Sequence, residues 1–309
     1  MNRSTTCTLP LEAEEPSCVL RGESGSVSEY PIHNFVRPST AVRYFWVDLD
    51  GTFVSHNAEC MKRNIETFLK AIARGHQIFF CTGRTLQGAL SALPVDVRES
   101  IGFHGYPGVY QNGAIVYGPD GRLLREAHFS SEVLSRIIDG ILYAKHEKYC
   151  IFLSKDSWHV ITDDLSSIYS LLEILEITTE VEVSDVEGVK SSIITKIIIM
   201  DYDKISGNFH NMRGVDFIIK GGLDDIVDVS PIGVTKASGL EVLLSELGVS
   251  PSECGFIGDG ENDVEAMHFI GHSFAVGNAI DKAKAAAKYI VQQTNDECAF
   301  TTVMEAVYG

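Results

Sequence analysis

Hydrophobic residues in this chain form two kinds of pattern that alternate along its length. Continuous apolar runs, typical of strands buried on both faces of a parallel sheet, occupy residues 41–47, 77–81 and 255–257. Segments near these runs, such as 236–247, carry apolar residues at every third or fourth position, which predicts helices. This alternation of strands and helices predicts an α/β fold around an open parallel sheet.

A stretch of different character lies between the second and third of these strands. The elements that its pattern predicts are a helix from Ser131, strands at 149–153, 158–161 and 193–200, and helices at 164–175 and 203–212. This stretch is of mixed α+β type and carries no chemical motif of its own. We therefore expect a core made of residues 41–125 and 214–309 and an inserted domain at 126–213. Residues 1–40 are expected to be a poorly ordered N-terminal extension or, alternatively, a short docked strand.

The composition is that of a globular, soluble chain. Of its 309 residues, 45% are hydrophobic and 22% are charged, and its apolar runs are far shorter than the ~20 residues that span a bilayer. The formal net charge of −17 disfavours nucleic acid as a partner, and no membrane partner is expected. A phosphate site in such a chain must be made attractive locally, by a metal, a lysine or helix N-termini. The sequence gives no indication of the oligomeric state.

The seven cysteines are scattered and form no C-x-x-C pair, which is typical of reduced thiols and favours a cytoplasmic location. The first 40 residues have no apolar segment and carry five acidic residues. Both features argue against a secretory signal and a transit peptide.

Three apolar strands run directly into polar loops. Val47 is followed by Asp48, Cys81 by Thr82, and Ile257 by Gly258 and Asp259. Ligands of open parallel sheets bind beyond the carboxyl ends of the strands. If the three strands are neighbours, the side chains that converge there are Asp48, Asp50, Thr82, Asp259 and Asp263. Aspartate and glycine also favour ordinary turns, but that reading does not explain three such loops.

Four carboxylates in one place repel each other by roughly 4 kcal/mol per close pair at an effective dielectric near 20. Either some of them are protonated or a divalent cation lies among them, and a ligand set of oxygen atoms favours Mg²⁺. The spacing does not fit an EF-hand calcium loop. Lys236, at the start of a helix, is the candidate cation for phosphoryl charge, although a lone lysine is more often a solvated side chain. These carboxylates, the hydroxyl, the lysine and Mg²⁺ suit a phosphoryl transfer in which Asp48 attacks phosphorus. Asp50 would protonate the leaving oxygen and later activate water.

The same residues carry a resemblance to a known family. Residues 48–52 (Asp-Leu-Asp-Gly-Thr), 82–84 (Thr-Gly-Arg), Lys236 and 258–263 (Gly-Asp-Gly-Glu-Asn-Asp) resemble the four motifs of the haloacid dehalogenase-like (HAD) hydrolases. The pattern is most similar to the Cof-type subfamily IIB, whose members are mostly sugar-phosphate phosphatases. Two further segments are similar to that branch: residues 111–114 (Gln-Asn-Gly-Ala) resemble its Asn-Gly-Ala hairpin, and residues 195–199 (Thr-Lys-Ile-Ile-Ile) resemble one of its cap strands. The resemblance covers about residues 41–309 and implies a Rossmann-like core with an inserted α+β cap of type C2, which selects the substrate.

The resemblance also implies a role for each motif residue. Asp48 would be the nucleophile and Asp50 the acid/base. Mg²⁺ would be held by Asp48, the main-chain carbonyl of Asp50 and Asp259, with Asp263 supporting them. The residues that would bind phosphate are Thr82, Gly83, Lys236 and Asn262. One departure is Ala237, where the family often has glycine after the lysine.

These observations predict a Mg²⁺-dependent phosphatase of small phosphorylated metabolites, sugar phosphates foremost. Two alternatives remain open: a phosphotransferase or mutase on the same core, similar to phosphomannomutase, and a non-catalytic sensor of phosphorylated metabolites. The role of Arg84 is also open, because it could contact the phosphate or pair with a nearby acid.

Overall fold

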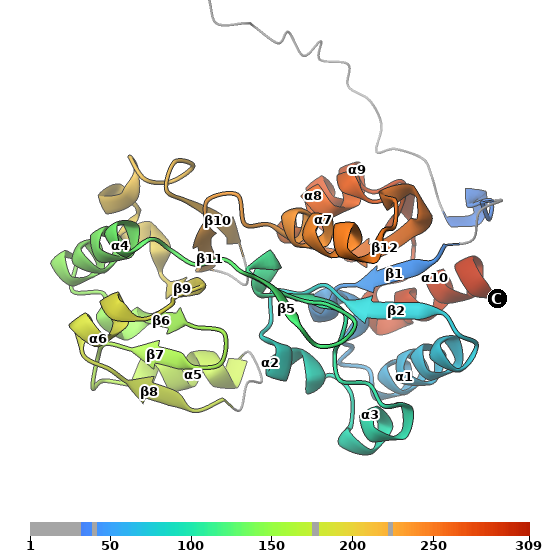
Figure 1. Ribbon diagram of the computed structural model, residues 1–309, viewed down its shortest axis with the longest axis horizontal. Coiled ribbons are helices and arrows are strands. Elements are labelled where there is room, and N and C mark those ends of the chain that lie inside the picture. The colour runs from blue at the N-terminus through green and yellow to red at the C-terminus, as the bar shows by residue number, and fades with distance from the viewer. Residues whose placement is uncertain (1–31, 39–41, 175–178, 222–224) are drawn as a thin grey trace, which may run out of the picture.

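The computed structural model describes residues 32–38, 42–174, 179–221 and 225–309. They form two lobes, each built on its own sheet, with a small three-stranded sheet beside the first (Figure 1). Most of the predicted N-terminal extension lies outside the described residues.

The first lobe contains a five-stranded sheet in the order β14-β13-β12-β1-β2, with every neighbouring pair parallel. Its strands are β1 (Tyr44–Val47), β2 (Gln77–Phe80), β12 (Cys254–Gly258), β13 (His272–Ala275) and β14 (Tyr289–Ile290). The predicted α/β fold with a parallel core sheet is confirmed. The three strands that precede the polar loops are neighbours, because β1 lies between β12 and β2. In this register Val47 is level with both Phe80 and Ile257, so the three polar loops leave the sheet at the same edge.

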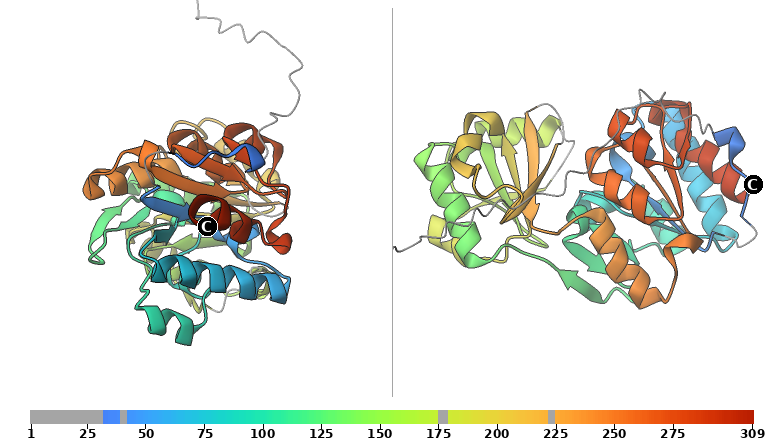
Figure 2. Two further views of the ribbon diagram at one scale, coloured as in Figure 1. Left: turned by 90° about the vertical axis from the view of Figure 1, so that its right-hand side faces the viewer. Right: turned by 90° about the horizontal axis from the view of Figure 1, so that it is seen from above.

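Helices cover both faces of this sheet (Figures 1 and 2). They are α1 (Ala58–Ala73), α2 (Leu86–Leu90), α3 (Val95–Ile101), α7 (Lys236–Leu247), α8 (Val264–Phe269), α9 (Asp281–Ala286) and α10 (Ala299–Tyr308). Aromatic side chains join the loop after β1 to α1 and α10, since Phe53 packs edge-on against Phe68 of α1 and Phe300 of α10. Burial of these side chains is the main favourable term in holding the lobe together.

The small sheet consists of the antiparallel strands β3 (Gly108–Tyr110), β4 (Ile115–Tyr117) and β5 (Leu123–Glu126). It is attached to the core sheet where Cys81 forms a bridge with Val109. Residues 111–113 turn the chain between its first two strands, with Asn112 in the left-handed region at φ 56°. This turn therefore lies directly beside the loop that follows β2.

The second lobe contains a six-stranded sheet in the order β10-β11-β9-β6-β7-β8. Its strands are β6 (Cys150–Leu153), β7 (Trp158–Val160), β8 (Val181–Val183), β9 (Lys196–Met200), β10 (Phe217–Gly221) and β11 (Ile226–Pro231). Its helices are α4 (Ser131–Tyr143), α5 (Ser166–Ile174) and α6 (Val186–Ser191). Successive side chains of β9 point to opposite faces: Ile197 packs in a cluster with residues of α4 and α6, and Ile198 in one with residues of α5.

The structure differs from the predicted second lobe in two places. The helix predicted at 203–212 is replaced by two short 3-10 turns, at Tyr202–Lys204 and Ser206–Phe209. Its Ser-Gly-Asn sequence at 206–208 consists of weak helix formers. The inserted domain was predicted to end at residue 213, which is too early: β10 and β11 pair with one another, and β11 pairs with β9 of the same sheet. The second sheet thus continues to Pro231.

The described part of the predicted extension is docked on the first lobe. Residues 32–34 form a 3-10 turn, and Phe35 packs edge-on against Phe274 and Tyr289. Arg37 donates a hydrogen bond of 2.8 Å from Nε to the carbonyl of Ala306. Residues 32–38 of the predicted extension are therefore packed on the first lobe, and their described element is a turn, whereas the sequence suggested a short docked strand as the alternative.

Candidate active site

Three aspartates meet at the edge of the core sheet where its strands end. Asp48 follows β1, Asp259 follows β12, and Asp263 immediately precedes α8. One carboxylate oxygen of each lies within 4.8 Å of those of the other two. The predicted convergence is therefore found for Asp48, Asp259 and Asp263.

Lys236 enters this acidic cluster from the start of α7. Thr235 caps that helix by accepting a hydrogen bond from the Ser238 amide, which sets the direction in which the first helical residue projects. The Lys236 ammonium is fully buried and lies 2.5 Å from Asp48 Oδ1 and 2.6 Å from Asp263 Oδ1. The lysine predicted as a phosphate-binding cation is thus paired with two carboxylates.

Asp263 also fixes the loop that follows β12. Its second oxygen, Oδ2, accepts hydrogen bonds of 2.9 Å from the amides of Asp259 and Gly260. Because one carboxylate holds both the lysine and these two amides, Asp263 supports the arrangement of its neighbours.

Burial has the largest single effect on the pKa values of Asp48, Asp259 and Lys236. Burial raises the pKa of Asp48 well above its ordinary value; Lys236 opposes this, whereas Asp263 and Asp259 add to it. Burial, followed by repulsion from Asp263, raises the pKa of Asp259 to about 7. Burial alone would lower the pKa of Lys236, but Asp263 and Asp48 outweigh it and raise that pKa, so the lysine is charged.

The cluster fits a divalent cation bound by oxygen atoms. Three ionised carboxylates and one ammonium leave two negative charges, which a single Mg²⁺ balances. The pKa values of Asp48 and Asp259 are raised because both carboxylates are buried beside other carboxylates, with Lys236 as a neighbouring cation. No nitrogen or sulfur ligand is among the group, which favours Mg²⁺ over zinc.

The loop between β1 and α1 packs closely on Asp259. The hydroxyl of Thr52 donates to Asp259 Oδ1 over 3.1 Å. Gly51 has φ 70°, and a Cβ at this position would collide with the Asp259 carboxylate. Only glycine therefore lets this loop approach the acidic cluster.

The side chain of Asp50 lies outside the acidic cluster. Its carboxylate pairs with Arg84, with Nη2 2.5 Å from Oδ1, and is 61% exposed. Of the two roles open for Arg84, pairing with an acid is the one found. The Asp50 carboxylate is thus not part of the group formed by the other three, so the predicted convergence does not hold for its side chain.

The predicted phosphate residues Thr82 and Gly83 follow β2 on the other side of Asp48. Thr82 is buried, and its amide donates to the Val109 carbonyl over 2.9 Å. Asn262, from the loop after β12, donates from Nδ2 to Asn112 Oδ1 over 2.9 Å. Asn112 in turn donates its amide to the carbonyl of Thr82 over 3.1 Å. The turn at 111–113 therefore joins two predicted phosphate-binding loops.

Three polar residues at this position were not among the predicted site residues. Asn112 and Lys196 lie in segments that carried only the family resemblance, and Asp228, like Lys196, belongs to a strand of the second lobe. Lys196 Nζ lies 3.0 Å from Asp228 Oδ2, and that same oxygen accepts a 2.9 Å hydrogen bond from Asn112 Nδ2. The available signal was a lysine at the start of the apolar run Lys196–Met200, because a buried charge in a strand needs a partner.

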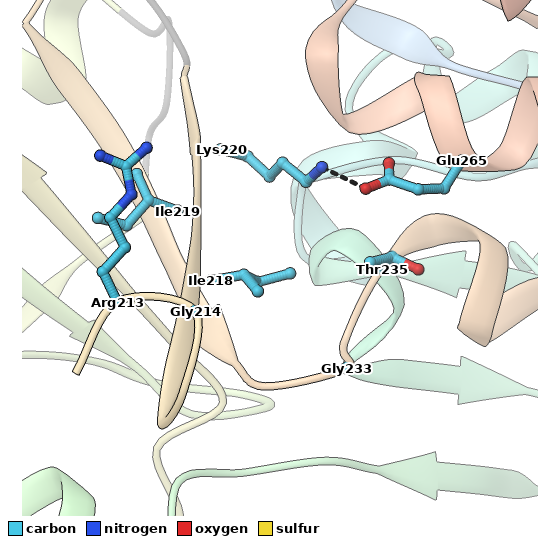
Figure 3. Close-up of a pocket in the computed structure, with 8 residues that line it drawn as sticks. All are labelled: Arg213, Gly214, Ile218, Ile219, Lys220, Gly233, Thr235 and Glu265. Carbon is cyan, nitrogen blue, oxygen red and sulfur yellow. Dashed lines mark hydrogen bonds and ion pairs between the residues drawn. The ribbon is translucent and has the colours of Figure 1, made fainter. Parts of the chain in front are cut away.

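A further contact joins the lobes beside a pocket of about 230 Å³. Figure 3 shows Lys220 of β10 and Glu265 of α8 pointing toward one another, with Nζ 2.5 Å from Oε1. The lining residues are Arg213, Gly214, Ile218, Ile219, Lys220, Gly233, Thr235 and Glu265. The pocket thus lies between β10 of the second lobe and the N-terminal parts of α7 and α8 in the first, and none of the clustered aspartates lines it.

Comparison with known proteins agrees with this geometry. The sequence model for haloacid dehalogenase-like hydrolases matches residues 45–302, which is most of the chain. The chain belongs to the haloacid dehalogenase-like hydrolases. The resemblance seen in the sequence motifs is thereby confirmed.

Two curated relatives illustrate the range of proteins that contain this HAD unit. The chain is 28% identical over 279 residues to the chloroplastic endoribonuclease YBEY of Arabidopsis thaliana; the match covers 86% of the chain but spans only 46% of that protein. It is 25% identical over 250 residues to an HMP-PP phosphatase of Escherichia fergusonii, covering 77% of the chain and 85% of the relative. The family and the phosphatase relatives confirm the predicted enzyme class, a HAD phosphatase.

Solved structures share the two-lobed fold. A HAD/COF-like hydrolase of Plasmodium vivax superposes with a TM-score of 0.80 at 26% identity, covering 87% of this chain and 96% of that one. The structure of TM0651 from Thermotoga maritima gives a TM-score of 0.72 at 24% identity, covering 86% of this chain and 98% of that one.

Within the described ranges, every helix is too short or too polar to cross a lipid bilayer.

Proposed function

We propose that this chain is a Mg²⁺-dependent phosphatase of small phosphorylated metabolites, sugar phosphates foremost, that forms an aspartyl-phosphate on Asp48. The observation that carries the proposal is the buried contact of Lys236 with Asp48 and Asp263 beside Asp259. A carboxylate held at a fixed position next to a cation is suited to attack a phosphorus atom, whose charge that cation also offsets.

The cation would be held by Asp48, Asp259 and the main-chain carbonyl of Asp50. Bound Mg²⁺ neutralises charge on the transferring phosphoryl group and keeps the carboxylates ionised. Lys236 orients the Asp48 carboxylate and contributes a second positive charge beside it. Asp263 holds Lys236 and the amides of the loop after β12, and so acts on the reaction through them.

The reaction needs two proton transfers, which we assign to Asp50. Asp48 attacks phosphorus, the bond to the leaving oxygen breaks, and Asp50 gives that oxygen its proton. Asp50 then takes a proton from water as the water oxygen attacks phosphorus, which releases phosphate and restores Asp48. Arg84 holds the Asp50 carboxylate at the rim of the site, where a leaving group would lie.

The other phosphate oxygens would be bound by groups at the ends of β2 and β12. These groups are the Thr82 hydroxyl, the Gly83 amide and the side chain of Asn262. Backbone amides and hydroxyls are suited to hold phosphate oxygens without bringing in further negative charge.

We propose that the second lobe, with its sheet extended to Pro231, is the cap that selects the substrate. The relatives named for phosphatase activity act on HMP-PP, and one structural neighbour is a subclass IIB sugar phosphatase. Both names support a small phosphorylated organic molecule as substrate. The cytoplasmic location remains a prediction from the cysteine pattern.

The test is release of inorganic phosphate from a panel of sugar phosphates and small organic pyrophosphates. Wild type and Asp48→Asn are compared with Mg²⁺ and with EDTA. The proposal is supported if phosphate is released only by wild type and only when Mg²⁺ is present. Trapping of a phosphorylated protein in the Asp50→Asn variant would support the aspartyl-phosphate intermediate. Activity that survives Asp48→Asn would refute the mechanism.

The same experiment distinguishes the alternatives. Recovery of phosphate on a second sugar instead of in water would identify a phosphotransferase or mutase. Binding of phosphorylated ligands without turnover by folded, Mg²⁺-binding protein would indicate a sensor.

A further inference from the structure

Two residues of the second lobe hold the loop that follows β2 in the first. Lys196, at the start of β9, donates from Nζ to the Gly83 carbonyl over 3.0 Å and to Asp228 Oδ2 of β11 over 3.0 Å. Asp228 accepts from Asn112 Nδ2 over 2.9 Å. Lys196 is 5% exposed, so these partners replace the water that would otherwise solvate its ammonium group.

The hydrogen bonds fix both peptide groups that flank Gly83. The carbonyl of Thr82 accepts from the Asn112 amide, and in a trans peptide the Gly83 N–H points the opposite way. In the next peptide, the Gly83 carbonyl accepts from Lys196 and the amide of Arg84 donates to Thr82 Oγ1 over 3.1 Å. The orientation of the Gly83 N–H is therefore determined by Asn112 on one side and by Lys196 on the other.

The turn that carries Asn112 is itself bound by the neighbouring strands of the second lobe. Gln111 donates from Nε2 to the Ser154 carbonyl over 2.9 Å, and its Oε1 accepts from the Thr195 hydroxyl. The residues next to Lys196 and next to Asn112 are thus bonded to each other. A shift of the second lobe would move Lys196 and this turn together.

We propose that Lys196 and Asp228 are positioning residues that aim the Gly83 amide at the phosphate and make its orientation depend on the position of the second lobe. The inference rests on the proposed phosphatase function and deepens it. Lys196 acts on the peptide group and Asp228 acts on Lys196 and Asn112, without contact of either with the phosphorus or the nucleophile. The phosphate-binding loop is then complete only when the second lobe lies against it.

Two other roles for Lys196 make different predictions. If it binds the organic part of the substrate, its removal would affect substrates but not inorganic phosphate, which has no organic part. If it only docks the lobes, its removal would resemble loss of the Lys220–Glu265 pair, which joins the lobes without touching the loop at 82–84. Lys220→Met is therefore the matched control.

The experiment measures inhibition by inorganic phosphate together with kcat and KM in the presence of Mg²⁺. Lys196→Met, Asp228→Leu, Asp228→Asn and Lys220→Met are compared with wild type, and thermal unfolding confirms that each is folded. We expect the inhibition constant for phosphate to rise about tenfold or more in Lys196→Met and Asp228→Leu, with a fall in kcat. Asp228→Asn, which keeps an acceptor of the same length, should recover part of the loss.

Three outcomes would overturn the inference: an unchanged inhibition constant for phosphate in Lys196→Met, an effect confined to KM for particular substrates, or an equal effect in Lys220→Met. If Lys196→Met does not fold, the comparison of Asp228→Asn with Asp228→Leu gives the same decision. Wild type that releases no phosphate from any substrate would instead refute the proposed function. Inorganic phosphate binding by the variants would still test the loop by itself.

Discussion

The guanidinium of Arg84 contacts both carboxylate oxygens of Asp50: Nε lies 3.1 Å from Oδ1 and 2.9 Å from Oδ2, and Nη2 lies 2.5 Å from Oδ1. Asp50 is only two residues from Asp48, yet its side chain faces away from the acidic cluster. The proposed nucleophile and the proposed acid/base are thereby given different surroundings, one buried beside Lys236 and one exposed beside Arg84.

The first prediction concerns this pair. Arg84→Met should lower kcat about tenfold, because the Asp50 carboxylate then rotates freely and is less often in position for proton transfer. The free energy of unfolding should fall by about 1–2 kcal/mol: the Asp50 carboxylate is 61% exposed and stays hydrated without its partner, whereas the Arg84 side chain, 17% exposed, also loses its hydrogen bond to the Gly88 carbonyl. Steady-state kinetics and urea unfolding measure the two effects.

A double-mutant comparison separates the two roles of Arg84. If Arg84 acts through Asp50, then adding Arg84→Met to Asp50→Asn lowers the residual rate no further. A further loss, together with weaker inhibition by inorganic phosphate, would mean that Arg84 binds the phosphate.

The second prediction concerns the buried charge of Lys236. Lys236→Met leaves Asp48 and Asp263 without their cation and should lower the free energy of unfolding by about 3–5 kcal/mol in EDTA. Mg²⁺ should restore part of this loss because it supplies positive charge to the same carboxylates. Urea unfolding with and without the metal measures both effects.

Lys282→Met is the matched control, because this lysine pairs with Glu261 at the surface and is 72% exposed. We expect it to change the free energy of unfolding by less than about 1 kcal/mol. A loss of similar size in both variants would contradict the assignment of Lys236 as the partner of buried carboxylates.

The third prediction separates stability from activity at Asp48. Its raised pKa means that the ionised carboxylate is unfavourable in the metal-free protein. Asp48→Asn removes that charge and keeps the size of the side chain, so in EDTA the variant should be as stable as wild type or melt a few degrees higher. The increase in Tm that Mg²⁺ gives wild type should be largely lost, as should phosphatase activity. A variant that melts well below wild type in EDTA would contradict this account.

The sequence predicted the core and its motif residues for a physical reason. A parallel strand buried on both faces must be apolar, so β1, β2 and β12 are recognisable as continuous runs, and the polar residue after each marks the end of the strand. The helix predicted at 236–247 agrees with α7 at both ends, because its capping residue and its terminal glycine are local signals.

The parts that the sequence did not predict depend on contacts between distant segments. β10 and β11 lie beyond the predicted limit at residue 213 because their place in the second sheet follows from pairing with β9, which leaves no local signal. The roles of Lys196 and Asp228 likewise depend on how the two lobes meet. The rotamer of Asp50 was not predictable either, since its neighbour Arg84 is set by the packing of another loop.

The last prediction concerns pH and the metal. Asp259 has a pKa raised from an ordinary 3.8 to about 7, mainly by burial and then by Asp263. Between about pH 4 and pH 7 the folded, metal-free protein carries a proton on Asp259 that the unfolded chain has already lost. This group therefore favours the folded state at low pH, and the advantage disappears as pH rises from about 4 through about 7.

Binding of Mg²⁺ requires the ionised carboxylate and must displace this proton. At about pH 6 we expect one proton or more to be released per Mg²⁺ bound, because the pKa values of both proposed ligands, Asp259 and Asp48, are raised; Mg²⁺ affinity should fall as pH decreases, and the number of protons released should be smaller at about pH 8. Calorimetry in two buffers of different ionisation enthalpy measures the number of protons. Asp216→Asn, which removes a carboxylate of the second lobe that pairs with Arg136, should leave the result unchanged. Proton release that is absent at both pH values would mean that Asp259 is ionised before the cation arrives.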